Sequence, residues 1–332
     1  MSLLEIQNLT TSFSTEQGKV HAVRGISLSV EQGEVVGIVG ESGSGKSQSM
    51  YSVMGLLSAN GTVESGSIVF DGKQISPAQF QGNKKEWEHC MQNIRGNTLS
   101  MIFQDPMSFL NPVLTIEQQL VEPLKNHKKL SKQQMHQKAV QLLEQVGIPS
   151  PEERLRQYPH QLSGGMRQRI IIAIALACGP KLILADEPTT ALDVTIQAKI
   201  MELLLQLRDQ TGTGIVLITH DLGVVASACS RIYIMYGGMI VEQGTADEIF
   251  YHAQHPYTQG LLACVQNPEQ DEELKPIPGS PPDLLAPPAG CPFADRCEKA
   301  RKGCKLYMPE FHQLSQTHSV RCWLVQKQQE VL

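Results

Sequence analysis

The sequence GESGSGKS at residues 40–47 restricts the possible folds of this chain more than any other stretch. It follows the apolar run VVGIV, which is typical of a strand buried on both faces, and it precedes the helical pattern QSMYSVMGLL. In this context the pattern G-x-x-x-x-G-K-[ST] indicates a loop that binds phosphate groups. Its glycines let backbone N–H groups turn inward around phosphate oxygens, and the helix N-terminus adds partial positive charge.

Two side chains of this loop have predicted roles toward a nucleotide. Lys46 is expected to reach the β- and γ-phosphates, and Ser47 to place its hydroxyl on Mg²⁺. The full set of loop residues expected to contact the nucleotide is Gly40, Ser42, Gly43, Ser44, Gly45, Lys46, Ser47 and Gln48.

The order of apolar runs predicts the fold class. Two more runs, LILAD at residues 182–186 and GIVLITH at residues 214–220, alternate with helical patterns, as in a parallel sheet covered on both faces. The first strand signals alternate apolar and polar residues, as antiparallel strands do. We therefore expect an α/β fold of the phosphate-loop (P-loop) nucleoside triphosphatase type with an antiparallel β subdomain.

Two further segments are predicted beside this sheet. Residues from about 106 to 165 are helical and polar, which indicates an inserted helical subdomain. The proline-rich stretch at residues 276–290 should be extended backbone. We expect a nucleotide-binding domain at residues 1–265 and a cysteine-containing C-terminal extension at residues 266–332.

Composition and hydropathy exclude some functions. The 332 residues carry a net charge of −5, which leaves no broad basic surface for nucleic acid. The opening residues do not resemble an export signal, so we expect the protein in the cytosol. The most apolar run, IIIAIALAC, is about half the roughly 20 residues that cross a bilayer, so it predicts a buried helix. Any membrane association is then expected to go through a partner.

Polar residues at the ends of the predicted strands are candidates for hydrolysis. Asp186 is expected to hold Mg²⁺, and Glu187 could activate a water as general base, although such a pair can also simply begin a solvated loop. Gln104 could bind Mg²⁺ or the attacking water, and His220 could contact a γ-phosphate. Either of these two could instead be an ordinary residue at a sheet edge.

The stretch LSGGMRQR at residues 162–169 contains a second glycine turn before a helix. Ser163 suits the N-cap position, and Gly164 and Gly165 leave open backbone at the first helical turn. This turn is a second predicted anion site, and its presence needs an explanation because the first loop is already complete.

These motifs resemble those of the ATP-binding-cassette ATPases, although Met166 replaces the glutamine that usually follows their signature LSGG. The resemblance implies that two such chains pair head to tail around two ATP molecules. Ser163 and Gly165 would then contact the γ-phosphate of ATP held by the partner. The resemblance further assigns ATP or Mg²⁺ contacts to Phe13 (stacked on adenine), Gln104, Ser163, Gly164, Gly165, Asp186, Asp193 and His220, in addition to the loop.

The C-terminal part resembles that of ATPase subunits of bacterial oligopeptide and dipeptide importers, in HPYTQGLL, PIPGSPP and CPFADRC. This resemblance implies an ATPase that energises peptide uptake at the cytoplasmic face of the inner membrane. It implies as partners a related second ATPase, two membrane-spanning permease subunits and, indirectly, a periplasmic binding protein. An importer of nickel or another solute, and a soluble cassette protein acting on ribosomes or DNA, remain alternatives.

Four cysteines, Cys291, Cys297, Cys304 and Cys322, form the pattern C-x5-C-x6-C-x17-C. Four cysteine thiolates in a segment with little hydrophobic core of its own indicate a metal site that stabilises its fold. Tight C-x2-C pairs, which zinc ribbons usually have, are absent, and this favours a [4Fe–4S] cluster. Zinc, disulfide pairs and free thiols remain open. The other cysteines, Cys90, Cys178, Cys229 and Cys264, are expected to be small core residues.

Overall fold

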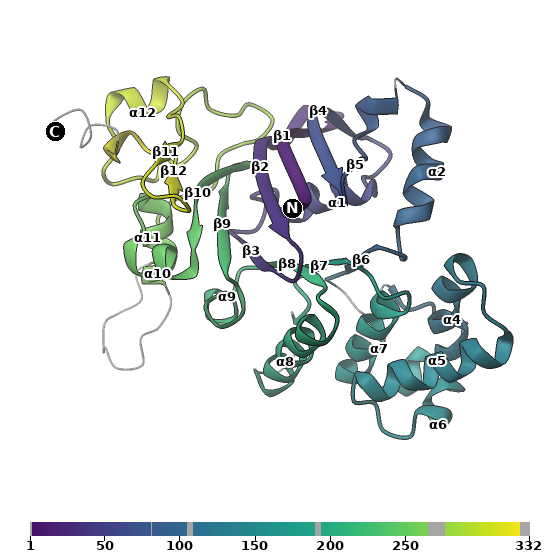
Figure 1. The fold of residues 1–332 in the computed structure, drawn as a ribbon. Coiled ribbons are helices and arrows are strands. Elements are labelled where there is room, and N and C mark those ends of the chain that lie inside the picture. The colour runs from purple at the N-terminus through teal and green to yellow at the C-terminus, as the bar shows by residue number, and fades with distance from the viewer. Residues whose placement is uncertain (1, 81, 105–108, 190–193, 265–275, 326–332) are drawn as a thin grey trace. The chain divides into compact units, whose positions relative to one another are not determined.

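The structure is a computed structural model that describes residues 2–80, 82–104, 109–189, 194–264 and 276–325 (Figure 1). These residues form two compact units. The first unit comprises Met1–Leu3, Glu31–Glu34 and Gly82–Leu217, and the second comprises Leu4–Val30, Val35–Gln81 and Ile218–Leu332. Asp193 and the expected start of the helical subdomain at residue 106 lie outside the described residues. The expected domain boundary at residue 265 stays a prediction.

The first unit contains two parallel strands, β6 (Leu99–Ile102) and β7 (Leu182–Asp186), paired from Leu99 with Leu182 to Ile102 with Ala185. It also contains most of β8 (Gly214–Thr219). Every residue of these strands is buried. The continuous apolar runs of β7 and β8 predicted this for those two strands, because a strand covered on both faces has no side for polar residues.

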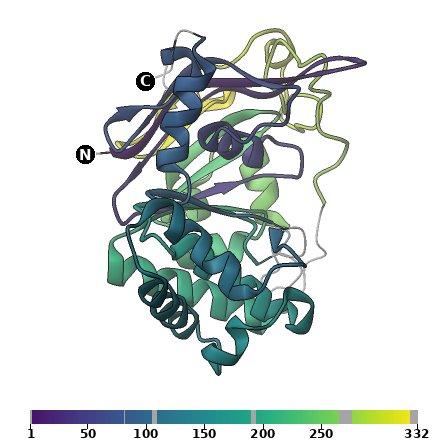
Figure 2. The same cartoon turned by 90° about the vertical axis from the view of Figure 1, so that its right-hand side faces the viewer.

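The helices of the first unit include α2 (Lys84–Ile94) and α8 (Val194–Thr211). Four others, α4 (Ile116–His127), α5 (Lys132–Gln145), α6 (Pro151–Leu155) and α7 (Gly164–Leu176), pack together (Figures 1 and 2). Helices α4 and α5 begin with capping boxes at Thr115 and Ser131. The helical character predicted for this part of the chain is confirmed.

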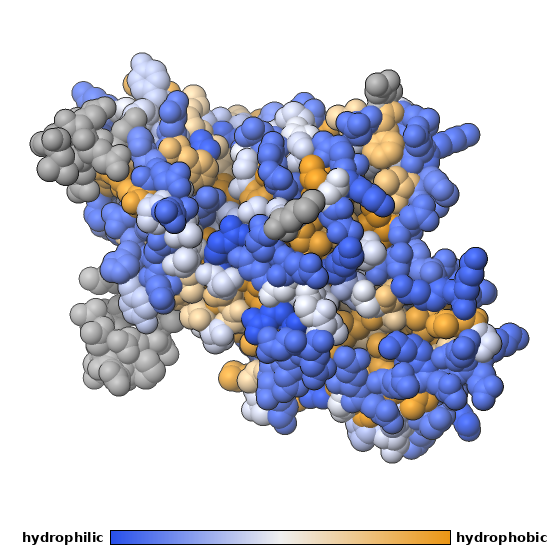
Figure 3. Space-filling model, in the orientation of Figure 1, coloured by the Kyte–Doolittle hydropathy of each residue, from blue (hydrophilic) through white to orange (hydrophobic). Residues whose placement is uncertain are grey.

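Helix α7 is the buried helix that the run IIIAIALAC predicted, since most of its residues are inaccessible. Polar residues cover much of the face drawn in Figure 3, as expected when helices bury one side and expose the other. Among the described residues, no helix combines the length and the apolar character that crossing a membrane requires.

The second unit contains an antiparallel sheet in the order β2-β1-β4-β5, as predicted for the N-terminal part. Its strands are β1 (Ser2–Thr15), β2 (Gly18–Glu31), β4 (Gly61–Phe70) and β5 (Lys73–Gln74). Strands β1 and β4 pair from Leu4 with Phe70 to Phe13 with Gly61.

The second unit also contains strands in the order β11-β12-β10-β9-β3. These are β3 (Val35–Val39), β9 (Arg231–Tyr236), β10 (Met239–Thr245), β11 (His312–Gln313) and β12 (Ser319–Val320). Strand β9 is parallel to β3, whereas β10, β11 and β12 follow one another antiparallel. The C-terminal extension therefore adds strands to the sheet edge, which the sequence did not predict.

Five α-helices of the second unit are described: α1 (Lys46–Met54), α9 (Leu222–Ala228), α10 (Ala246–His252), α11 (Pro256–Ala263) and α12 (Lys302–Leu306). The connector at residues 276–290 forms neither helix nor strand, as its prolines predicted. It runs beside β2, where the His21 N–H donates to the Leu284 carbonyl at 2.8 Å.

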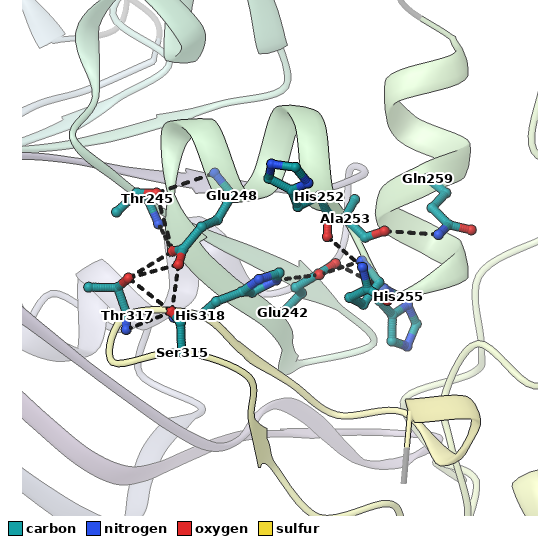
Figure 4. Close-up of polar contacts among 11 residues, drawn as sticks. Glu242, Thr245, Glu248, His252, Ala253, His255, Gln259, Ser315, Thr317 and His318 are labelled. Atoms are coloured by element: carbon teal, nitrogen blue, oxygen red, sulfur yellow. Dashed lines mark hydrogen bonds and ion pairs between the residues drawn. The ribbon is translucent and has the colours of Figure 1, made fainter. Parts of the chain in front are cut away.

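Two buried or half-buried carboxylates attach the extension to β10 and α10 (Figure 4). Glu242 is fully buried and accepts hydrogen bonds from the backbone of Gln254 and His255, and it lies 2.8 Å from His318 Nε2. Glu248 accepts from the hydroxyls of Ser315, at 2.6 Å, and Thr317, at 2.8 Å. These contacts hold residues 315–318 of the extension against the rest of the unit.

Candidate nucleotide-binding site

The loop at residues 40–47 is a tight cradle between β3 and α1. A Cβ atom on Gly40 would lie 2.1 Å from the Met235 carbonyl oxygen, and one on Gly45 would lie 2.3 Å from that of Ala22. Gly45 also has a φ of 98°, in the left-handed region. Only glycine fits at these two positions, so the backbone geometry of the motif is fixed by its packing.

Polar groups of this loop are oriented toward its interior. Lys46 is 6% exposed, and its ammonium donates to the carbonyl oxygens of Gly40, at 2.7 Å, and Glu41, at 2.9 Å. The Ser44 hydroxyl is buried and has no hydrogen-bond partner among the described residues. A buried hydroxyl without a partner is costly, and a phosphate oxygen would satisfy it. The loop therefore fits the phosphate ligand that its sequence predicted.

Phe13 lies on β1 opposite Gly61 of β4, in the same unit as the loop. A Cβ on Gly61 would approach the Phe13 ring to 2.6 Å, so the ring packs directly over the glycine. The ring is half-buried. Its predicted role in stacking on adenine stays a prediction.

The first unit carries the carboxylates. Asp186 is fully buried at the end of β7, and Glu187 follows with a φ of 46°. A glutamate in the left-handed region is strained, and such strain is concentrated at functional sites. Gln104 Nε2 donates to Glu187 Oε2 at 2.8 Å. The structure thus brings together two residues that the sequence singled out separately.

Gln168 is a residue of this region that the sequence analysis missed. It is 1% exposed inside α7, and its Nε2 donates to the Pro188 carbonyl at 2.6 Å. This hydrogen bond therefore connects helix α7 to Pro188, the residue directly after Glu187. No local signal marked it, because Gln168 lies between Arg167 and Arg169 in the polar first turns of the helix.

The second glycine turn has the geometry of a capped helix N-terminus. The Ser163 hydroxyl accepts from the Met166 N–H at 3.3 Å, which confirms the predicted N-cap. Ser163 and Gly164 are exposed, and a Cβ on Gly164 would meet no atom within 4 Å. A Cβ on Gly165 would lie 3.4 Å from Ile196. The role of this turn toward a partner's nucleotide stays a prediction.

His220 is exposed and follows β8 in the second unit, and the next residue, Asp221, caps α9. The second unit thus holds the phosphate loop, Phe13 and His220. The first unit holds Gln104, Asp186, Glu187 and the second glycine turn. The sequence predicts that these two sets of residues act together in one reaction, and this stays a prediction.

The four C-terminal cysteines come together in the second unit. Cys291, Cys297, Cys304 and Cys322 line one cavity of about 20 Å³. Burial, with a smaller contribution from the neighbouring thiols, raises the pKa of Cys291 to about 12. However, no group of three or more His, Cys, Asp or Glu side chains in the described part of the chain is arranged to hold a metal ion. The predicted convergence is found, but a formed metal site is not.

The remaining cysteines partly follow the prediction. All eight cysteines are described and none forms a disulfide. Cys178 and Cys229 are buried, and burial raises the pKa of Cys229 to about 12. Cys90 is only half-buried. The prediction is wrong for Cys264, which is exposed because it caps the C-terminus of α11 at the surface.

A cradle for phosphate and a separate capped glycine turn, on an α/β scaffold with an antiparallel sheet and a helical segment, define an ATP-binding cassette. Comparison with protein families agrees. The model described as "ABC transporter" matches residues 23–190, and "Oligopeptide/dipeptide transporter, C-terminal region" matches residues 241–304. The chain belongs to the ABC transporter family, as one of its ATPases.

Individual relatives share nearly the whole chain. An oligopeptide transport ATP-binding protein, OppD of Bacillus subtilis, is 50% identical over 97% of this chain and 89% of its own. A dipeptide transport ATP-binding protein, DppD of the same organism, is 50% identical over 99% and 96%. Among solved structures, a dimeric post-hydrolysis state of the ATP-binding cassette MJ0796 bound to ADP and Pi is 28% identical, with a TM-score of 0.63, over 73% of this chain and 98% of that one.

Family membership has direct consequences for ligands and partners. ATP and Mg²⁺ are the ligands of this class of ATPase. The class acts as paired ATPases attached to membrane-spanning subunits. The pairing gives a reason for the second glycine turn, which is not needed to complete the first.

Proposed function

We propose that this chain is the ATP-hydrolysing subunit that energises import of dipeptides and other short peptides. The observation that carries the proposal is the match of residues 241–304 to the C-terminal region of oligopeptide and dipeptide transporters, because this region lies outside the common cassette. The names of the relatives, which refer to oligopeptide and dipeptide transport, support it.

In the proposed hydrolysis each residue of the predicted site has its own role. Lys46 neutralises charge on the β- and γ-phosphates, and Glu187 accepts a proton from the attacking water. Ser47, Gln104 and Asp186 would hold Mg²⁺, which supplies electrostatic stabilisation of the phosphates. The hydrogen bond between Gln104 and Glu187 supports a shared task for these two side chains. His220 would contact the γ-phosphate, and Asp193 belongs to the same proposed set.

The proposed assembly contains a homologous second ATPase subunit, so that the pair is a heterodimer. Ser163, Gly164 and Gly165 face the ATP held by that subunit, which the exposure of this turn supports. The ATPase pair closes on binding ATP and opens after hydrolysis, and two transmembrane permease subunits follow this movement. A periplasmic peptide-binding protein delivers the substrate. The chain is then a peripheral protein at the cytoplasmic face of the inner membrane, and it needs no contact with nucleic acid.

For the four cysteines we propose a [4Fe–4S] cluster as the ligand. Their convergence on one cavity and the absence of disulfides among them support this. Burial raises the pKa of Cys291, Cys297 and Cys322, which favours the neutral thiols in the protein alone. The positive charge of a bound cluster would instead stabilise the thiolate form that binds iron. Iron, sulfide and zinc analysis of anaerobically purified protein tests it. Zinc, or protein without metal, would contradict the cluster.

Uptake by the assembled complex tests the transport function. The chain would be reconstituted in vesicles with the permease subunits, the second ATPase and the binding protein. We expect ATP-dependent accumulation of a labelled dipeptide but not of nickel ions. Nickel uptake without dipeptide uptake would contradict the proposal and favour an importer for metal ions. Failure to co-purify with any membrane subunit would instead favour a soluble cassette protein.

A further inference from the structure

Glu41, the second residue of the phosphate loop, is held from three directions. Its backbone N–H donates to the Tyr257 hydroxyl at 2.8 Å. Its carbonyl oxygen accepts from the Lys46 ammonium at 2.9 Å, and its carboxylate accepts from Arg296 Nη1 at 2.7 Å. One loop residue therefore connects the phosphate-binding lysine, helix α11 and the C-terminal extension, all within the second unit.

The Arg296 guanidinium is fixed by more than this ion pair. Its side chain is only 6% exposed, and Nη1 also donates to the Tyr236 hydroxyl at 3.1 Å. Its Nε donates to the Pro278 carbonyl at 2.8 Å, and its Nη2 to the Ile277 carbonyl at 3.1 Å. Because all its nitrogens donate to fixed acceptors, the guanidinium can hold the Glu41 carboxylate in one place.

Arg296 also lies inside the cysteine-bearing segment, directly before Cys297. Its guanidinium carbon is 5.8 Å from the ring centre of Phe293, which lines the cavity of the four cysteines. The Phe293 ring in turn lies 5.2 Å from that of Tyr236 and 5.4 Å from that of Tyr257. Packed side chains therefore run without interruption from the cysteine cavity to the phosphate loop.

We propose that Arg296 is a positioning residue for the phosphate loop, acting through Glu41, so that the C-terminal extension sets the affinity of the loop for ATP. The inference rests on the loop being the ATP site, which is part of the proposed function. It does not depend on peptide transport or on the identity of a metal. If Arg296 served only to attach the extension, its removal would lower stability but leave the affinity of the folded chain unchanged.

The test is a double-mutant cycle on ATP affinity, measured by calorimetry on the purified full-length chain. Arg296→Met should raise the Kd for ATP on the order of tenfold, because the Glu41 carboxylate loses its fixed donor. Glu41→Gln should raise it as well. The Kd for ATP of the double variant should be no higher than that of the single variant with the higher Kd, because both changes remove the same contact. Arg296→Lys, which keeps the charge, should restore part of the affinity.

Arg321→Met is the matched control. Arg321 is a half-buried arginine that also lies directly before a cysteine of the extension, and desolvation lowers its pKa. Its guanidinium contacts the Pro309 carbonyl and the ring of Phe311, at 4.4 Å, and it makes no described contact with the loop. We expect its Kd for ATP to stay within about twofold of wild type.

Three results would overturn the proposal: an Arg296→Met chain that binds ATP within about twofold of wild type, an equal loss in Arg321→Met, or additive losses in the double variant. If Arg296→Met does not fold, the proposal is tested by the Kd for ATP of Glu41→Gln and of Tyr257→Phe. The first removes the carboxylate that Arg296 binds, the second removes the hydroxyl that accepts from the Glu41 N–H, and both leave Arg296 in place. Unchanged affinity in both would equally contradict it. None of these outcomes bears on the peptide-import proposal, which is tested by uptake.

Discussion

The two glycine turns of this chain both open a helix, but they are built differently. At α1 the N-cap is Gly45 in the left-handed region, with no side-chain cap, and carbonyl oxygens of Ala22 and Met235 close in on the backbone. At α7 the N-cap is Ser163 in extended conformation, with its hydroxyl bonded to its own helix. Around Gly164 there is open space.

This difference is consistent with the different tasks proposed for the two turns. The loop at α1 is enclosed by its own unit, and Lys46, Ser44 and the anchors of Glu41 belong to it. The turn at α7 is a complete helix N-terminus that its own unit leaves exposed. A surface of this kind has a use when a second molecule brings an anion to it. The comparison therefore agrees with pairing of two ATPases, each of which completes the site of the other.

The largest expected effect comes from Glu187→Gln, which leaves both turns intact and removes only the proposed base. Hydrolysis of the ATP held by this chain's own loop should fall about 1000-fold, because general base catalysis typically contributes that much. ATP binding should be kept, and the closed pair should accumulate in size-exclusion chromatography with ATP. Hydrolysis near the wild-type rate would show that Glu187 is not the base.

The second prediction tests the exposed turn. In complexes whose own hydrolysis is blocked by Glu187→Gln, the remaining turnover should come from the ATP held by the partner. Adding Ser163→Arg should lower that turnover about 100-fold, since it removes groups that contact the transferred phosphate. Ser131→Arg is the control, because Ser131 is an N-cap serine of the same geometry on α5. Equal effects of the two changes would contradict a special role for Ser163.

The third prediction compares the two turns directly. Gly45→Ala should raise the Kd for ATP of the isolated chain about 30-fold, as expected from roughly 2 kcal/mol of backbone strain. Gly164→Ala adds the same methyl group where no atom lies within 4 Å, so the Kd should not change. Calorimetry on both variants checks this. Similar losses in both would mean that the turns share one nucleotide within a single chain.

The smallest expected effect lies in the anchor at Glu248 (Figure 4), which touches neither turn. Burial alone would raise the pKa of Glu248, but hydrogen bonds from Ser315, Thr245 and Thr317 lower it to about 2. Its charge therefore stabilises the fold above about pH 4, the range of a free glutamate, and this contribution is lost as the pH falls toward 2.

Glu248→Gln should accordingly lower the free energy of unfolding at pH 7 by about 1 kcal/mol or less, since the site is partly solvated. The difference from wild type should shrink between pH 4 and pH 2 in urea titrations. Its Kd for ATP should stay unchanged. A difference that grew on acidification would contradict the assignment.

The sequence predicted those features that are determined by residues close together in the chain. The buried strands, the phosphate loop and the N-cap at Ser163 depend on neighbouring residues, so their patterns were sufficient. The contacts of Gln168 with Pro188 and of Arg296 with Glu41 join residues 20 and 255 positions apart, and no local pattern marks such pairs. The two-residue strands β11 and β12 are too short to show periodicity. Their place at the sheet edge comes from tertiary contacts such as those of Glu242.

The most direct measurement of the central claim is the rate of ATP hydrolysis per chain, from the isolated monomer to the assembled complex. The account predicts that a monodisperse monomer binds ATP but hydrolyses it far more slowly than the complex, and that the rate per chain rises as pairs form. A monomer that hydrolysed ATP at the full rate of the complex would contradict it.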